Sequence, residues 1–339
     1  MLKKRDLVSM AVMVAIIFIT LWLVLGGGKA GEVWRAVQLA KWPWLALGGF
    51  LMVCYTGMEG LQNKLTLSAM GHKVPYRHCV QFAATGFYFS SITPSSTGGQ
   101  PAQVFYMARR GISAAHGTLV MLLFTIVYQV VAVVWGVAAC FLAPEAPASL
   151  GTGLGVLLGY SLTTTALLTA GMIFLLVRPE PAERFCRWCL RLGVRLKLVR
   201  DLAKAEAGLE RQLEEYRNGA AVIRSHPTLV LKLLLAATAQ LTVRYLIPWT
   251  VYRALGLTEL SALRLVSTQA LVYLAVSCVP IPGTVGAAEG AFLAAYHSIF
   301  GGELVAAAML LSRTLAFYLP VLVTGASTAI LHRQTAKTP

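Results

Sequence analysis

Charged residues are scarce in this 339-residue chain, at 13% of the sequence, whereas 57% of the residues are hydrophobic. A soluble globular protein usually carries about a quarter charged residues, so the composition argues against an ordinary soluble protein. Six apolar runs approach or exceed the roughly 20 residues that span a bilayer as a helix. These runs are 7–26, 43–62, 116–142, 153–177, 228–252 and 304–331. The sequence therefore predicts an all-α polytopic membrane protein.

The sequence also lacks the common signatures of catalysis. It contains no nucleotide-binding glycine loop, no His-x-x-x-His pair and no Gly-x-Ser-x-Gly. The six cysteines are scattered, and Cys186-x-x-Cys189 has neither a second pair nor a nearby histidine, so zinc is not indicated. We therefore expect no enzymatic activity, no cofactor and no metal. No soluble segment is large enough for an ATPase, so any transport is not driven by ATP hydrolysis in this chain.

Positive charge is abundant, with a formal net charge of +15, but it lies between the apolar runs. This distribution indicates membrane topology rather than a nucleic-acid surface. The path that places 21 of the 29 Lys and Arg residues in the cytoplasm puts both termini there. The first apolar run resembles a signal peptide, but its length and the lack of a clear cleavage site favour a retained helix.

Two loops rich in proline, glycine and hydroxyl residues interrupt the apolar sequence and resemble each other. The first reads Thr93-Pro94-Ser95-Ser96-Thr97-Gly98-Gly99-Gln100-Pro101, and the second reads Pro280-Ile281-Pro282-Gly283-Thr284-Val285-Gly286-Ala287-Ala288-Glu289-Gly290. Both contain Pro-x-x-x-Gly. Irregular backbone at membrane depth is tolerated only where protein or a watery cavity surrounds it. Paired interruptions in two halves of a membrane protein indicate a transport site.

Each loop lies in a short, broken region that we predict to be a re-entrant helical hairpin. The region 79–108 has basic residues on both flanks, so it should enter and leave on the cytoplasmic side. The region 263–300 should dip from the outer side. The two halves then form an inverted repeat with about six transmembrane helices and two hairpins. The predicted parts are an N-terminal membrane half (1–177), a cytoplasmic amphipathic connector (178–226) and a C-terminal membrane half (227–339).

Three charged residues lie where the membrane interior is predicted in the C-terminal half. Arg244 and Arg313 fall within apolar helices, and Glu289 lies on the second loop. Arginine binds phosphate oxygens well, and the N–H groups near Gly283 and Gly286 could add hydrogen-bond donors. These residues predict a phosphate-binding site. The alternative is a Glu–Arg pair that only fastens the hairpin to its neighbouring helix.

Milder polar residues occupy the corresponding region of the N-terminal half. Thr93, Thr97 and Gln100 are candidates to line the inner part of a cavity, and Arg109 could gather anionic head groups from the inner leaflet. Positive-inside bias is the simpler explanation for Arg109. Glu59 lies near the expected cytoplasmic end of its helix, where a solvated surface carboxylate is a strong alternative to a functional one.

These motifs resemble a known family. Ile92-Thr93-Pro94 through Gly98-Gly99-Gln100-Pro101, followed by Arg109-Arg110-Gly111, resembles the first signature of the lysylphosphatidylglycerol synthase transmembrane (flippase) family. Pro280-x-Pro282-Gly283-x-x-Gly286-x-x-Glu289, followed by Arg313 and Tyr318-x-Pro320, resembles the second. The resemblance implies a stand-alone membrane part without the aminoacyl-transferase domain of fused members. Gln100 stands where the family commonly has a carboxylate.

The sequence as a whole predicts a lipid translocase of the bacterial cytoplasmic membrane. It would move an anionic phospholipid, a glycolipid or a polyprenyl-linked lipid between leaflets. Two alternatives stay open, which are an accessory subunit that presents a lipid to a separate glycosyltransferase and an ion-coupled carrier of small solutes. The expected partners are membrane lipids, with a homo-oligomer and a partner glycosyltransferase also open, and no nucleic acid.

Overall fold

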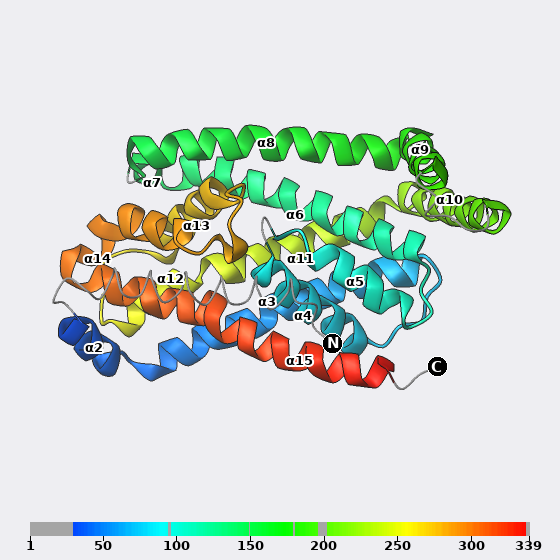
Figure 1. Ribbon diagram of the computed structural model, residues 1–339. Coiled ribbons are helices and arrows are strands. Elements are labelled where there is room, and N and C mark those ends of the chain that lie inside the picture. The colour runs from blue at the N-terminus through cyan, green and yellow to red at the C-terminus, as the bar shows by residue number, and fades with distance from the viewer. Residues whose placement is uncertain (1–29, 94–95, 149, 179, 196–201, 337–339) are drawn as a thin grey trace.

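The computed structural model describes residues 30–93, 96–148, 150–178, 180–195 and 202–336, and the regular elements in these ranges are helices (Figure 1). Within these described ranges, five stretches are long and apolar enough to cross a membrane. These are Trp42–Ala69, Ala114–Leu142, Gly151–Val177, Pro227–Ala254 and Pro282–Gln334. They include five of the six predicted apolar runs, and the run at 7–26 lies outside the described residues. These helices and membrane-length stretches confirm the predicted class, an all-α polytopic membrane protein.

The N-terminal part of the described chain contains helices α2 to α8. Their bounds are α2 Ala30–Leu39, α3 Trp42–Ala69, α4 Tyr76–Ile92, α5 Gly99–Ala108, α6 Ala114–Leu142, α7 Glu145–Ala148 and α8 Gly151–Val177. Two helices, α9 Glu180–Arg195 and α10 Leu202–Ser225, connect this part to the rest. The C-terminal part contains α11 Pro227–Tyr245, α12 Ile247–Ala254, α13 Ala262–Val276, η2 Pro282–Thr284, α14 Ala287–Arg313, η3 Thr314–Tyr318 and α15 Leu319–Ala336.

Local sequence explains where several of these helices begin. Proline occupies the first turn of α3 and of α11, where its missing N–H would have no helical partner. Ser113 caps α6 by accepting a hydrogen bond from the N–H of His116 at 3.2 Å. Ser261 caps α13 in the same way, with the N–H of Arg264 at 3.3 Å. Such caps satisfy donors that would otherwise be orphaned at the helix start.

Each of the two special loops joins a pair of helices, and the loops meet near the centre of the molecule. The first joins α4 to α5, and the second, which contains η2, joins α13 to α14 (Figure 1). Element η2 packs against α4. An apolar cluster of Ile92, Val285, Phe317 and Val321 holds the end of α4 against the second loop and the last helices. The sides of the membrane from which the two loops approach stay a prediction.

The last apolar stretch is interrupted twice. The backbone at Gly301 leaves the helical region (φ 74°, ψ 160°), so α14 is bent between the range predicted for the second hairpin and that predicted for the last helix. The second interruption is η3, a turn of π-helix directly after Arg313, in which the N–H of Leu319 reaches the carbonyl of Thr314. Single π-turns inside α-helices occur often at functional sites.

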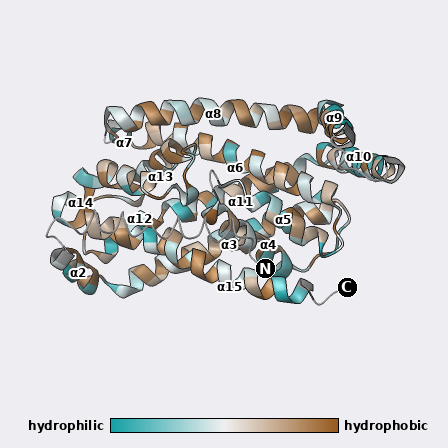
Figure 2. Cartoon of the chain, in the orientation of Figure 1, coloured by the Kyte–Doolittle hydropathy of each residue, from teal (hydrophilic) through white to brown (hydrophobic). Residues whose placement is uncertain are grey.

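The outermost helices differ in character along the chain. Helix α8 lies along one side of the bundle and exposes large apolar side chains, including Val156, Leu167 and Phe174, as expected of a surface that faces lipid (Figures 1 and 2). Helices α9 and α10 gather at one end and carry much of the hydrophilic sequence (Figure 2). They are joined by a charged pair between Glu183 and Arg217.

Candidate functional site

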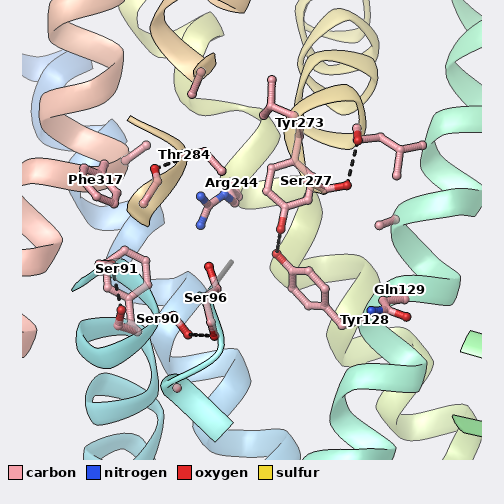
Figure 3. A pocket seen from close by; sticks show the side chains of 18 of the residues that line it. Ser90, Ser91, Ser96, Tyr128, Gln129, Arg244, Tyr273, Ser277, Thr284 and Phe317 are labelled. Carbon is pink, nitrogen blue, oxygen red and sulfur yellow. Dashed lines mark hydrogen bonds between the residues drawn. The ribbon is translucent and has the colours of Figure 1, made fainter. Parts of the chain in front are cut away.

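A cavity of about 650 Å³ lies where the two special loops meet (Figure 3). Side chains from both halves of the chain line it. Those used below are Tyr55, Glu59, Ser96, Thr97, Gln100, Gln103, Tyr128, Arg244, Tyr273, Gly283, Thr284 and Arg313. The lining is rich in hydroxyl and amide groups, whereas the surrounding bundle is largely apolar. The cavity is therefore the polar centre of a membrane protein.

Both loops reach this cavity through strained backbone. Ser96 in the first loop (φ 55°) and Thr284 in the second (φ 52°) are the non-glycine residues with positive φ in the described part of the chain. Both line the cavity. Left-handed backbone is uncommon for such residues and clusters at functional sites when the surroundings enforce it. The two loops thus share an unusual conformation as well as a sequence pattern.

In the second half, Glu289 and Arg313 form a closed network. The Nε of Arg313 donates to Oε1 of Glu289 at 2.7 Å, and the hydroxyl of Tyr318 donates to the same oxygen at 3.2 Å. The N–H of Gly286 donates to Oε2 at 2.6 Å. The Glu289 side chain is only 1% exposed and that of Arg313 is 12% exposed. Glu289 therefore lies behind the cavity wall with its charge neutralised.

Gly283 fixes the loop against this network. Its carbonyl accepts a hydrogen bond from Nη2 of Arg313 at 3.3 Å, and its φ of 59° is left-handed. A Cβ at this position would overlap the Phe317 ring, with Cε2 at 2.8 Å. The guanidinium of Arg313 lies 4.4 Å from the centre of the same ring. Only glycine allows the loop, the arginine and the phenyl ring to approach so closely.

Arg244 faces the same cavity but has no carboxylate partner in the described part of the chain. Among the described residues, the ion pairs join Arg187 to Glu210, Arg217 to Glu183, Arg264 to Glu145 and Arg313 to Glu289. The guanidinium of Arg244 instead lies over two aromatic rings, 5.0 Å from that of Tyr55 and 5.3 Å from that of Tyr273. Figure 3 shows it between the two loops, with Tyr273 to one side.

Three tyrosines complete the surroundings of Arg244. The hydroxyls of Tyr55 and Tyr128 lie 3.2 Å apart, and those of Tyr128 and Tyr273 lie 2.9 Å apart. These residues come from α3, α6 and α13, so the chain of hydroxyls links helices of both halves. Cation–π contacts hold a guanidinium without neutralising it. Arg244 therefore keeps a full positive charge beside the cavity.

Glu59, one helical turn after Tyr55 on α3, also lines the cavity, and the structure rules out the surface alternative for it. Its residue exposure is 6%, so it is not a solvated surface carboxylate. Its Oε1 accepts a hydrogen bond from Nε2 of Gln103 at 2.8 Å, and Oε1 of Gln103 accepts one from Nδ2 of Asn63 at 3.1 Å. Gly86 on α4 makes room for the Gln103 side chain, because a Cβ there would overlap its amide.

The structure brings together five of the nine residues expected in the site. Arg244, Arg313, Gly283, Thr97 and Gln100 line the cavity. Glu289 and Gly286 lie behind its wall, and the N–H of Gly286, expected to serve a ligand, is already used by Glu289. The expectation that this N–H is available is therefore wrong.

The remaining two expected residues lie away from the cavity. The hydroxyl of Thr93 donates to the carbonyl of Phe89 at 2.6 Å and accepts from the N–H of Gly98 at 2.9 Å. Thr93 thus closes the first loop and is not among the lining residues. Arg109 is exposed at the end of α5, with its guanidinium 5.0 Å from the centre of the Phe105 ring.

Sequence reasoning overlooked the tyrosines and underrated Glu59. Tyr55, Tyr128 and Tyr273 each lie well inside an apolar or broken segment, and their hydroxyls at membrane depth were a signal that could have identified them. No cluster of three or more potential metal-ligating His, Cys, Asp or Glu side chains occurs in the described ranges. The arrangement is thus suited to binding an anion through Arg244 and neighbouring hydroxyl and amide groups.

Comparison with known proteins identifies the family of the chain. Residues 10–324 match the family model described as the lysylphosphatidylglycerol synthase TM region. A "UPF0104 membrane protein" from Archaeoglobus fulgidus is 24% identical over 268 residues, which cover 76% of this chain and 76% of that protein.

Proposed function

The chain belongs to the lysylphosphatidylglycerol synthase TM region family, and we propose that its central cavity moves an anionic lipid head group between the two leaflets of a membrane. The lipid would be a phospholipid, a glycolipid or a polyprenyl-linked lipid. Its acyl or prenyl chains stay in the bilayer, and only the polar head crosses through the protein.

The observation that carries this proposal is the unneutralised charge of Arg244. Charged side chains inside a membrane are expensive and mark substrate pathways or binding sites by default. Arg244 faces the cavity, and the contacts that hold it are aromatic rings rather than a carboxylate. A phosphate from a lipid head group would supply the missing negative charge, and a guanidinium can bind it with two parallel hydrogen bonds.

Arg313 would act beside Arg244. Because Glu289 takes its Nε and the carbonyl of Gly283 takes Nη2, Arg313 is held in place before any substrate arrives. Its guanidinium still lines the cavity, where it adds positive potential. Thr97 and Gln100, on the opposite loop, are placed to hydrogen-bond hydroxyls of a glycerol or sugar.

The likeness of the two loops supports movement across the membrane rather than binding alone. Inverted repeats with interrupted helices provide alternating access in many transporters. Here each loop bears one strained hydroxyl residue, Ser96 or Thr284, at the same cavity. In the proposed topology one loop approaches from the cytoplasm and the other from outside, in a bacterial cytoplasmic membrane with both chain termini in the cytoplasm. Arg109 would then collect anionic head groups at the inner surface.

Reconstitution in liposomes with a fluorescent anionic phospholipid tests the proposal. Wild-type protein should expose the labelled lipid of the inner leaflet to an added quencher, and Arg244→Gln should abolish this movement without a large loss of thermal stability. Arg253→Gln is the matched control, because Arg253 is held over Trp44, at 5.2 Å from the ring centre, and is absent from the cavity lining. Full activity of Arg244→Gln would contradict the proposal.

The same preparation separates the two alternatives. Wild-type protein that binds the lipid but does not move it would indicate an accessory subunit for a separate enzyme. Protein that moves a small anionic solute and no lipid would indicate a carrier.

A further inference from the structure

Glu59 is a buried carboxylate that the proposed handling of phosphate does not use. It lies on α3, ten residues before the helix ends at Ala69, which corresponds to about 15 Å of helix. It lines the cavity, and the hydrogen bond to its carboxylate comes from the neutral amide of Gln103. None of the ion pairs in the described ranges includes it.

One amide hydrogen bond does not compensate a buried carboxylate anion. An isolated charge in a medium of low polarity is destabilised by many kcal/mol, and such groups become neutral or acquire a cationic partner instead. Glu289 has acquired Arg313. Glu59 has no such partner among the described residues, so its ionised form is poorly stabilised, and the charge of whatever occupies the cavity decides how tightly the carboxylate holds a proton.

The protonation of Glu59 decides the net charge of the cavity region. Arg244 and Arg313 contribute two positive charges, and Glu289 contributes one negative charge. With Glu59 ionised the four groups sum to zero, and with Glu59 protonated they sum to +1. An anionic head group is therefore attracted most strongly when Glu59 carries a proton, and by linkage a bound anion strengthens proton binding at Glu59.

The other titratable and charged groups around α3 do not provide a fixed counter-ion for Glu59. Those that line the cavity with it are Tyr55, Tyr128, Tyr160, Arg244, Tyr273, Cys278 and Arg313. Others on the surrounding elements include Lys64 on α3, which is exposed, Cys79 on α4, Tyr106 on α5, Tyr245 on α11, Arg253 on α12 and Tyr318 on η3. Cys79 and Tyr106 belong to a separate apolar cluster, Arg253 lies over Trp44, and Tyr318 is bonded to Glu289. Arg244 and Arg313 are the described cations that line the cavity with Glu59, and neither forms an ion pair with it, since Arg313 is paired with Glu289.

We infer that Glu59 is a proton-binding site that is loaded together with the anionic head group. One proton then crosses with each lipid that carries one negative charge, and no net charge is moved. This inference rests on the proposed function. In the step, a proton from water forms an O–H bond with the Glu59 carboxylate as the anion reaches Arg244, and the same proton returns to water when the anion leaves. Gln103 orients the carboxylate towards the cavity.

Infrared titration of the purified protein tests the proton site without any transport assay. Wild-type protein should show the carbonyl band of a protonated carboxyl group that Glu59→Gln lacks. The control Glu303→Gln, which changes an exposed carboxylate, should keep the band. An unchanged band in Glu59→Gln would overturn the inference. Should that variant fail to fold, Gln103→Met keeps the carboxyl group and should shift the band frequency, because it removes the hydrogen bond; an unshifted band would also overturn it.

A pH gradient across proteoliposomes tests the coupling. At one proton per lipid, each pH unit should change the equilibrium distribution of a fluorescent anionic lipid by up to about tenfold. The gradient should lose its effect in Glu59→Gln, and a sodium gradient should have none in wild type. If the Glu59 band titrates but no lipid moves, the proposed function fails and the proton site stands. If lipid moves and Glu59→Gln responds to pH as wild type does, or if sodium drives the movement, the inference fails and the proposed function stands.

Discussion

Two carboxylates are buried at the centre of this protein, one in each half, and they are held in opposite ways. Glu289 receives hydrogen bonds from a guanidinium, a tyrosine hydroxyl and a backbone N–H. Glu59 receives one from an amide. The first arrangement fixes a charge permanently and fastens the second loop to the last helices. The second leaves a charge that depends on what else is in the cavity. A buried acid can therefore be a fastener or a switch according to its hydrogen-bond partners.

The largest expected effect comes from making Glu289 resemble Glu59. Arg313→Ala removes the cationic partner from a carboxylate that is 1% exposed. Breaking a buried pair in this way typically costs about 3–5 kcal/mol, so we expect a strong loss of folded protein. Detergent-solubilised yield and melting temperature measure it.

The double variant Glu289→Gln with Arg313→Gln then distinguishes structure from function. It removes both charges and keeps side chains that form hydrogen bonds, so stability should largely return. Lipid movement should stay absent if Arg313 contributes to binding the phosphate. A stable double variant with full activity would reduce the pair to a structural fastener.

A smaller effect is expected from loosening the loop that Glu289 and Arg313 hold. Gly283→Ala places a Cβ against Phe317 in a left-handed conformation, which together should cost about 2–4 kcal/mol. The matched control is Gly290→Ala, where a Cβ meets nothing within 4 Å and the residue lies in α14. That control should be neutral or stabilising by up to about 1 kcal/mol, because alanine favours helix. Equal melting temperatures for the two variants would show that the loop is not tightly fixed.

Stability should respond little to neutralising Glu59. Because no ion pair in the described ranges involves this carboxylate, Glu59→Gln leaves no cation unpaired and keeps a hydrogen-bonding group beside Gln103. We expect the free energy of unfolding to stay within about 1 kcal/mol of wild type near neutral pH, as is usual when no buried charge loses its partner. Thermal or denaturant unfolding measures it. Glu289→Gln, in contrast, orphans Arg313 and should destabilise markedly. Similar losses for both variants would break the distinction between fastener and switch.

The smallest effect should come from a pair outside the candidate membrane-spanning helices. Arg217 holds the pKa of Glu183 below its usual range by a direct hydrogen bond, so the folded state favours the ionised form. This stabilisation is present above the unfolded pKa of roughly 4.3 and disappears as the pH falls through the lower folded value. The difference in melting temperature between wild type and Glu183→Gln should be small at pH 7, because Arg217 is half exposed, and should disappear once the pH has fallen below the lowered pKa of the folded state.

Much of this architecture could be predicted from the sequence. The apolar runs identified the long helices, because length and hydrophobicity decide which segments enter a bilayer. The paired loop motifs indicated a shared polar centre, and the pairing of Glu289 with Arg313 followed from two opposite charges at similar depth. The hydrogen-bond partners of individual groups could not be predicted. The position of a residue along an apolar run gives its approximate depth in the membrane, but not whether an N–H such as that of Gly286 already has an acceptor.

The error at Glu59 has a specific cause. The apolar run of α3 ends near residue 62, because Gln62, Asn63 and Lys64 interrupt it, and hydropathy alone places the membrane edge there. In the structure α3 continues to Ala69. Gln62 is buried and bonds Gln240 at 2.7 Å, while Asn63 is buried and bonds Gln103. Polar residues that hydrogen-bond one another inside the bundle have the same low hydropathy as surface residues, so a hydropathy argument cannot tell them apart.

The π-turn after Arg313 determines how α15 is rotated about its axis relative to α14. In a regular α-helix, residues five apart point about 140° away from each other at 100° per residue. Here Arg313 and Tyr318, five apart, both bond Oε1 of Glu289, since the wider turn closes over one additional residue. The additional residue therefore mainly changes the rotation of α15 about its own axis, and hardly changes the length of the helix. Deleting one residue from 314–318 would turn everything after it by about 100°, so the lipid-facing and protein-facing sides of α15 would be rotated even though each of its side chains is unchanged.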